Sequence, residues 1–276
     1  MNLLDTGFKI ATIAGNTYRE AIRMKLFLLL AFVALGSLAG GFAFGEFNLG
    51  ASELRFIADF GFGGMTLFGS LAAVVITVQL LYGEIERRTI LPLMAKPIGR
   101  GAFLCGKLLG AWFTVVSFIV ALALSLMLVL WIRESQLMAV YPDAFEDGRI
   151  VSYGNVALFA FLQVMRLVIL ASVSVFFASY ATSSLFAIFM GVFFWIIAQL
   201  QGVASEQIAS SGGMLEWLFR FVALAVPDLR MFDLGGDVIA GDGIGLLLVA
   251  KLVGYALLYA ILYAGFAAMI LRRREL

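Results

Sequence analysis

Long uncharged stretches alternate with short charged segments along the chain of 276 residues. A helix needs about 20 mostly apolar residues to cross the roughly 30 Å hydrocarbon core of a membrane. Stretches close to this length occur at about 26–45, 60–82, 108–132, 154–180, 185–200 and 245–271. The uncharged run through the fourth and fifth stretches is too long for one crossing, so we place a turn at residues 181–184. The pattern predicts an all-α integral membrane protein with six transmembrane helices in a single domain, 1–276.

A segment ahead of the first span is amphipathic. Residues 7–25 repeat apolar side chains at three-to-four spacing through Phe8, Ala11, Tyr18 and Ile22, while the basic residues fall largely elsewhere. This pattern is typical of a helix that lies in the membrane interface. It also suits a simple charged anchor before a span, and both interpretations stay open.

The longest connection between spans, residues 201–243, contains a second segment that does not cross. Residues 214–226 are apolar, but this length is too short for a transmembrane helix. We predict a re-entrant or interfacial helix that Pro227 ends.

The basic residues predict the orientation of the chain. Outside the span interiors, twelve Lys and Arg lie in the N-terminal segment, in residues 83–107 and at the C-terminus, against five in the other connections. Cytoplasmic loops carry the excess of basic residues. Both termini and the segment 83–107 are therefore predicted to be cytoplasmic.

The composition excludes several classes of function. The chain is 63% hydrophobic, its formal net charge is only +1, and it has no His and a single Cys, Cys105. This leaves no basic field for nucleic acid and no His-based acid–base chemistry or zinc site. An intramembrane protease or lipid-modifying enzyme would need a nucleophile–base pair or metal ligands in the spans. A secondary transporter would favour acidic residues within the predicted spans, and these spans contain none.

The segment 83–107 is the most charged part of the chain between its termini. Its order of charges and prolines predicts a short helix at the membrane surface, then a turn at residues 97–100. A soluble partner could dock on such a helix, although an ordinary cytoplasmic loop would have a similar composition. Residues 101–107 read GAFLCGK and Leu108 follows, so the Ser or Thr of a nucleotide-binding loop is missing. We therefore do not expect this chain to hydrolyse ATP.

The same segment carries a resemblance to a known family. An acidic pair, a Thr-hydrophobic step, a Pro-x-x-Arg turn and a Gly-Lys step follow one another here, with Gly106 before Lys107. With the six-span layout, this resembles the permease subunits of ABC-2-type ABC transporters. It is most similar to the single-domain permeases that include the nitrous-oxide-reductase copper-maturation subunits and the gliding-motility permeases.

The resemblance implies an architecture and partners. It implies a non-catalytic exporter subunit in a bacterial plasma (inner) membrane, paired with a second copy or a related permease. Two separate ATPase subunits would bind ATP and Mg, this chain would bind no cofactor, and an external accessory protein would be a further candidate partner. The segment 83–107 would be the coupling helix, with these contact residues: Glu84, Glu86, Arg87, Arg88, Thr89, Leu93, Pro97, Arg100 and Lys107.

Arg166 is a basic residue about 12 positions into the fourth predicted span. A charge near the membrane centre costs about 2.5–3.5 kcal/mol on insertion scales and marks a candidate functional site. Gln163, one turn earlier, could share its face, so both could line a translocation path and bind an anionic part of the cargo. Alternatively, carbonyl groups or Gln79 on a neighbouring span could satisfy Arg166 in a purely structural role.

The external connection 201–243 offers aromatic and acidic residues. Trp217, Asp228 and Phe232 could form an external gate or receive a partner protein. A metal site is an alternative, although the acidic spacing does not follow the EF-hand pattern. A solvated loop with an interfacial helix fits the same composition.

Overall fold

The computed structural model describes residues 3–45, 52–86, 99–142, 151–208, 224–236 and 245–273. The elements in them are helical, and these residues contain no strand. They are α1 (Leu3–Arg23), α2 (Lys25–Gly45), α3 (Ser52–Glu86), α5 (Arg100–Val140), α6 (Tyr153–Tyr180), α7 (Ser184–Ile208), the short 3₁₀ helix η2 (Arg230–Phe232) and α10 (Leu246–Arg273).

These helices confirm an all-α integral membrane protein. Five of them, α3, α5, α6, α7 and α10, are long and apolar enough to cross a membrane within the described residues. The helices α1 and α2 pass the same test as a pair, with a bend of 61° between them. Each of the predicted crossings thus corresponds to a helix or to part of one.

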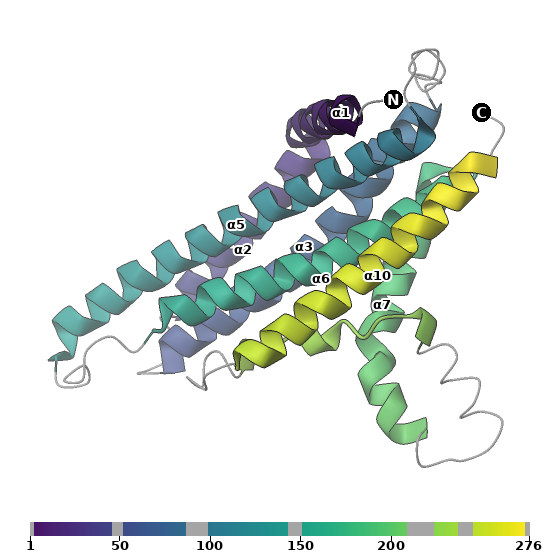
Figure 1. Ribbon diagram of the computed structural model, residues 1–276. Coiled ribbons are helices and arrows are strands. Elements are labelled where there is room, and N and C mark those ends of the chain that lie inside the picture. Colours follow the sequence, from purple (N-terminus) through teal and green to yellow (C-terminus); the bar gives the residue numbers. More distant parts are fainter. Residues whose placement is uncertain are drawn as a thin grey trace.

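The helix α6 is the centre of the bundle. It contacts α3, α5, α7 and α10, and its buried residues lie on all its sides. The long helices α3, α5, α6 and α10 run side by side, whereas α7 lies at a steep angle to them (Figure 1). Because most of α6 is apolar on all its sides, it can be surrounded by other helices.

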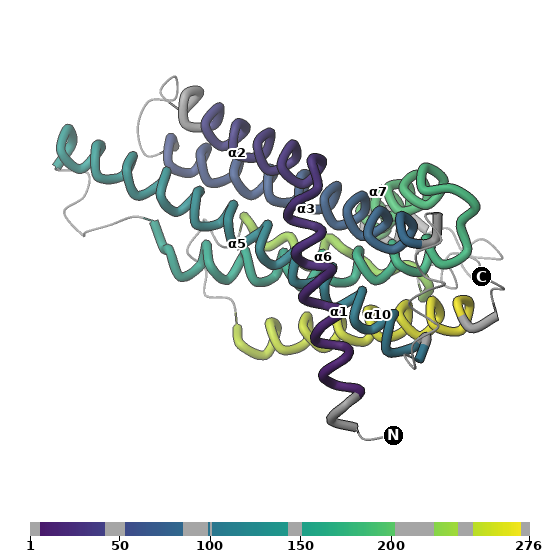
Figure 2. Tube along the Cα trace, turned by 90° about the horizontal axis from the view of Figure 1, so that it is seen from above, coloured from purple at the N-terminus to yellow at the C-terminus, as the bar shows by residue number. Residues whose placement is uncertain are grey.

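The helix α1 crosses over the other helices at a large angle (Figure 2) and packs on α5. We call the end of the bundle that holds α1, Glu86, Arg100 and Arg273 the α1 end. The opposite end holds the starts of α3 and α6 and the end of α5, and we call it the far end.

The contact face of α1 differs from the predicted apolar face. Phe8 is 74% exposed and Ala11 is exposed, while Ala14, Thr17 and Ala21 are buried. The reason lies in α5, where glycines let the backbone of α1 approach closely. A Cβ atom on Gly110 would come within 2.8 Å of the Ala14 carbonyl oxygen and 2.5 Å of Thr17 Cβ.

The helices extend beyond the predicted crossings. The third predicted stretch ended at residue 132, whereas residues 133–140 continue α5 as a helix. The apolar residues 137–140 return after four polar ones, and Glu134 is satisfied inside the protein, so the helix continues. Residues 83–86 likewise continue α3, and residues 100–107 are the first two turns of α5.

We predict that Gly110→Ala lowers the midpoint of thermal unfolding in detergent. The added methyl group meets the α1 backbone, and overpacking of this kind costs about 1–3 kcal/mol. Gly254→Ala in α10 is the matched control, because no atom lies within 4 Å of its added Cβ and alanine favours helix. Equal midpoints in the two variants would contradict the close packing of α1 on α5.

Candidate functional site

A buried lysine joins three helices at the α1 end. The Nζ atom of Lys107 lies 2.6 Å from Glu84 Oε1 of α3 and 3.4 Å from Glu20 Oε2 of α1. The Lys107 side chain is only 4% exposed, so it needs these carboxylates to offset its lost hydration. Lys107 therefore faces into the bundle, where it links α1, α3 and α5, and does not contribute to an exposed docking surface.

The other predicted coupling residues lie around this cluster or outside the described residues. Glu86 is the last residue of α3, and Arg100 is the first residue of α5. Gly99 precedes α5 in an extended conformation, with φ −63° and ψ 141°. The remaining residues predicted to contact the ATPase lie outside the described residues: Arg87, Arg88, Thr89, Leu93 and Pro97.

An apolar cluster holds the ends of the helices together beside Lys107. Leu104 and Leu108 of α5 pack in the same buried cluster as Ala178 of α6 and Leu271 of α10. Tyr82 of α3 joins them, and its hydroxyl donates a hydrogen bond to the Thr182 carbonyl oxygen at 2.5 Å. A force applied at the α1 end therefore acts on α3, α5, α6 and α10 together.

Arg166 lies at the centre of α6 and is completely buried. Its position in the helix is about 20 Å from Tyr153 and about 21 Å from Tyr180, at 1.5 Å per residue. The Nη1 atom of Arg166 donates to Gln163 Oε1 at 3.4 Å, so the structure brings these two predicted residues together.

The structure does not bring Gln79 to Arg166. The rings of Phe62 and Phe159 lie 4.1 Å apart, and Gly69 of α3 lies against Leu167 of α6, so the two helices run parallel. Gln79 is ten residues beyond Gly69, roughly 15 Å farther along α3. No hydrogen bond joins it to Arg166 among the described residues.

Among the described residues, Asp233 is the acidic residue whose charge acts on Arg166. The sequence did not connect these two residues. The carboxylate of Asp233 interacts electrostatically with the Arg166 charge. It belongs to the connection between α7 and α10, far from α6 in sequence. A sequence signal for this pair does not exist, because it depends on how deeply that connection enters the bundle.

Residues 224–236 enter the bundle beside α7 and α10. Three tyrosines of α10 bind their backbone: Tyr263 donates to the Ala225 carbonyl at 2.6 Å, Tyr259 donates to the Leu224 carbonyl at 3.0 Å, and Tyr255 accepts from the Asp228 N–H at 2.8 Å. The Leu229 N–H also donates to the Ala198 carbonyl of α7 at 3.3 Å. The segment thus lies at the depth of the middle of α10.

The predicted gate residues have different positions in this segment. Phe232 is completely buried and lies 6.3 Å from Tyr255, measured between ring centroids. Asp228 is half-buried, and its Oδ1 atom accepts a hydrogen bond from the Arg230 N–H. Trp217 lies outside the described residues. In the part of the chain that the structure describes, no group of three or more His, Cys, Asp or Glu side chains could hold a metal ion.

A second group of buried charges lies at the far end, between the third and fourth predicted stretches. Arg133 of α5 donates to Glu53 of α3. Glu134 is completely buried and accepts from the Val151 N–H at 3.0 Å and from the Tyr153 hydroxyl at 2.7 Å. These contacts tie α5 to α3 and to the start of α6.

A comparison with known families adds to this geometry. The profile of the ABC-2 family transporter proteins matches residues 11–212, which is more than half of the chain. This chain belongs to that family. No curated protein matches it. The chain is therefore a membrane permease of the ABC transporter type, and the family works in general with ABC ATPase subunits.

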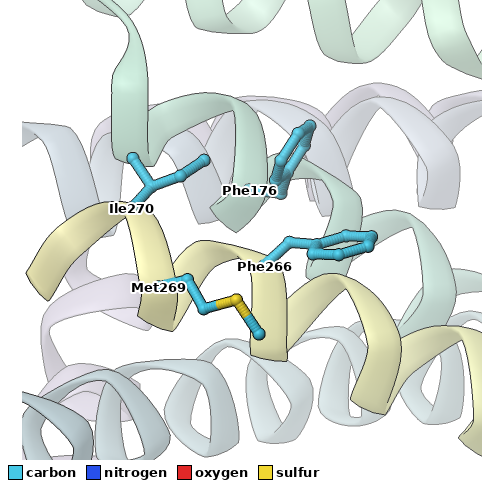
Figure 3. Close-up of a pocket in the computed structure, with 4 residues that line it drawn as sticks. All are labelled: Phe176, Phe266, Met269 and Ile270. Carbon is cyan, nitrogen blue, oxygen red and sulfur yellow. The ribbon is translucent and has the colours of Figure 1, made fainter. Parts of the chain in front are cut away.

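The permease also has an apolar cavity of about 430 Å³ between α6 and α10, near the α1 end. Figure 3 shows the side chains that line it, Phe176 from α6 and Phe266, Met269 and Ile270 from α10. An apolar lining can hold a hydrocarbon chain but cannot orient a polar ligand. The polar groups able to recognise a ligand lie instead around Arg166.

We predict that Lys107→Met lowers the midpoint of thermal unfolding of the permease markedly. Removing one partner of a buried ion pair typically costs about 3–5 kcal/mol. Glu20→Gln is the matched control, because Glu20 is 43% exposed and an exposed pair contributes only about 0–1 kcal/mol. A smaller shift for Lys107→Met than for Glu20→Gln would rule out Lys107 as the centre of the cluster.

Proposed function

We propose that this chain is the membrane subunit of an ATP-driven exporter and that it couples ATP hydrolysis by a separate subunit to translocation of a cargo. Two permease copies, or this chain and a related permease, would stand above two ATPase subunits in a bacterial inner membrane. The chain itself would be non-catalytic and bind no cofactor, while ATP and Mg would be bound by the ATPase.

The observation that carries this proposal is the Lys107 cluster. The segment 87–98 connects α3 to α5, and the ion pairs of Lys107 join these two helices to each other and to α1. An ATPase that displaces the connecting segment would therefore move three helices as one unit. The excess of basic residues supports a cytoplasmic position for this end of the bundle.

We propose residues 224–236 as the gate that responds to this helix movement. They pack with their backbone against α7 and α10, and α10 reaches the α1 end through Leu271. A tilt of α10 would change the position of the tyrosines that hold the segment. This links the ATPase side to a segment that lies at the depth of the middle of α10.

A first experiment tests the partner. The tagged permease, extracted in mild detergent from its native cells, should carry an ATPase with a nucleotide-binding loop in a ratio near one to one. Its mass as a complex should correspond to two permease subunits and two ATPase subunits. Purification of a stable permease without any ATPase, at several salt concentrations, would contradict the proposal.

A second experiment tests the docking segment. Reversing both charges in Arg87→Glu/Arg88→Glu should abolish association with the ATPase while leaving membrane insertion intact, because the reversal would put repulsive charges in the proposed docking interface. Arg55→Glu, an exposed reversal at the far end, is the matched control and should bind normally. Association and coupled ATP hydrolysis that survive the double reversal would exclude this segment as the docking site.

A further inference from the structure

Arg166 and Gln163 differ from the other buried polar residues of α6. Ser172, Ser174 and Ser179 each donate their hydroxyl to the carbonyl oxygen four residues earlier, at 2.7–2.8 Å. These serines are satisfied by their own helix. Among the residues that the structure describes, Arg166 Nε, Arg166 Nη2 and Gln163 Nε2 are buried without a hydrogen-bond partner.

The unpartnered groups have one chemical character. All three are N–H donors, and the guanidinium also carries a full positive charge. Gln163 Oε1 binds Arg166 Nη1, so the donating nitrogen of the same amide lies beside the guanidinium. A guanidinium fork binds two oxygens of a carboxylate or phosphate at once. The arrangement is thus complementary to an anion and not to a cation or a neutral donor.

Asp233 supplies an acidic group close to this place. A Cβ atom on Gly235 would lie 3.7 Å from Asp233 Oδ1 and 3.4 Å from Phe159 Cε2, so the carboxylate and the Phe159 ring both lie beside Gly235. Phe159 is two turns before Arg166, and a long helical side chain leans toward the start of its helix. Asp233 and Arg166 thus belong to two segments that meet beside Gly235 and Phe159, and the Asp233 charge acts on Arg166. Asp233 itself is exposed and forms no hydrogen bond to the guanidinium.

The surroundings of these donors are apolar. Leu162 and Ile169, on the same side of α6 as Arg166, belong to a buried cluster with Phe232 and Tyr259. A small inorganic anion would gain nothing from these side chains. A molecule with an anionic group and a hydrocarbon part would contact both the donors and the cluster.

We propose that Arg166 and Gln163 form a binding subsite for the anionic group of an amphiphilic cargo, and that Asp233 offsets the Arg166 charge while the subsite is empty. That the ligand is the transported cargo rests on the proposed function; that the subsite binds an anion does not. Access requires movement of residues 224–236, because Arg166, Leu229 and Phe232 are all completely buried.

The test measures anion binding by the purified permease alone, without ATP. The protein in neutral maltoside micelles is titrated with dodecyl phosphate, and in parallel with dodecyltrimethylammonium of the same chain length. The midpoint of thermal unfolding should rise with dodecyl phosphate and saturate, because a ligand that binds the folded state stabilises it. It should not rise with the cation. An equal response to both amphiphiles would overturn the proposal.

Variants locate the binding. Arg166→Gln should weaken dodecyl phosphate binding by roughly tenfold or more, since a charge-assisted bidentate contact is lost. Arg166→Lys keeps the charge without the guanidinium fork and should retain part of the affinity. Gln163→Leu removes one N–H donor and should measurably weaken dodecyl phosphate binding. Lys251→Gln is the matched control, because it removes an exposed positive charge from α10, and it should bind as the unaltered protein does.

Asp233→Asn gives the opposite sign. If Asp233 offsets the Arg166 charge, its neutralisation should tighten dodecyl phosphate binding several-fold. The reason is that the Asp233 carboxylate has the same sign of charge as the phosphate and repels it. A purely structural Arg166 would show no gain. Unchanged binding in Arg166→Lys, Gln163→Leu and Asp233→Asn together would overturn the subsite, even if Arg166→Gln failed to fold.

The two proposals can fail separately. Normal anion binding in a permease that never associates with an ATPase would refute the transporter proposal and keep the subsite. If Arg166→Gln and Gln163→Leu leave both ATP-driven transport and dodecyl phosphate binding unchanged, the anion binds at another place. That outcome would keep the transporter proposal and refute the subsite.

Discussion

The structure depends on one constraint, which is that polar groups inside a membrane protein must be satisfied by the protein itself. An unsatisfied backbone group in hydrocarbon costs several kcal/mol. The serines of α6 bind their own helix, and Lys107 is held by carboxylates from two other helices. Residues 224–236 leave the helical pattern at membrane depth, and the three tyrosines of α10 supply hydrogen bonds to their backbone. Irregular backbone is tolerated there because α7 and α10 supply hydrogen-bond partners for it.

The same constraint explains why the charges at the two ends have different neighbours. At the α1 end one buried cation serves α1, α3 and α5, so these helices are tied at a single point. At the far end Glu134 of α5 accepts hydrogen bonds from Val151 and Tyr153 at the start of α6, while Arg133 donates to Glu53 of α3. Both ends of α3 and α5 are therefore fixed to each other, and these two helices can move only as a pair.

Hydropathy was sufficient to predict the long apolar helices, because the length of each apolar stretch is visible in the sequence. It also singled out Arg166, since a charge among apolar residues is visible in one dimension. The contact face of α1 was not predictable, because its apolar surface is wide and Gly106 and Gly110 of α5 decide which part packs. The inward position of Lys107 and the relation of Asp233 to Arg166 depend on residues far apart in sequence. Gln79 was an attractive partner by type, but the parallel register of α3 and α6 places it at another depth.

The tyrosines of α10 have a mechanical consequence. Tyr255, Tyr259 and Tyr263 follow one another at intervals of four residues and therefore lie along one face of the helix. A rotation of α10 about its own axis would carry all three hydroxyls away from residues 224–228 at the same time. A small tilt would instead lengthen the three hydrogen bonds unequally. Because α10 is a continuous helix from Leu246 to Arg273, torque applied at its last turn reaches these hydroxyls. In this permease the rotation angle of α10 would therefore determine whether residues 224–228 keep these three hydrogen bonds or lose them together.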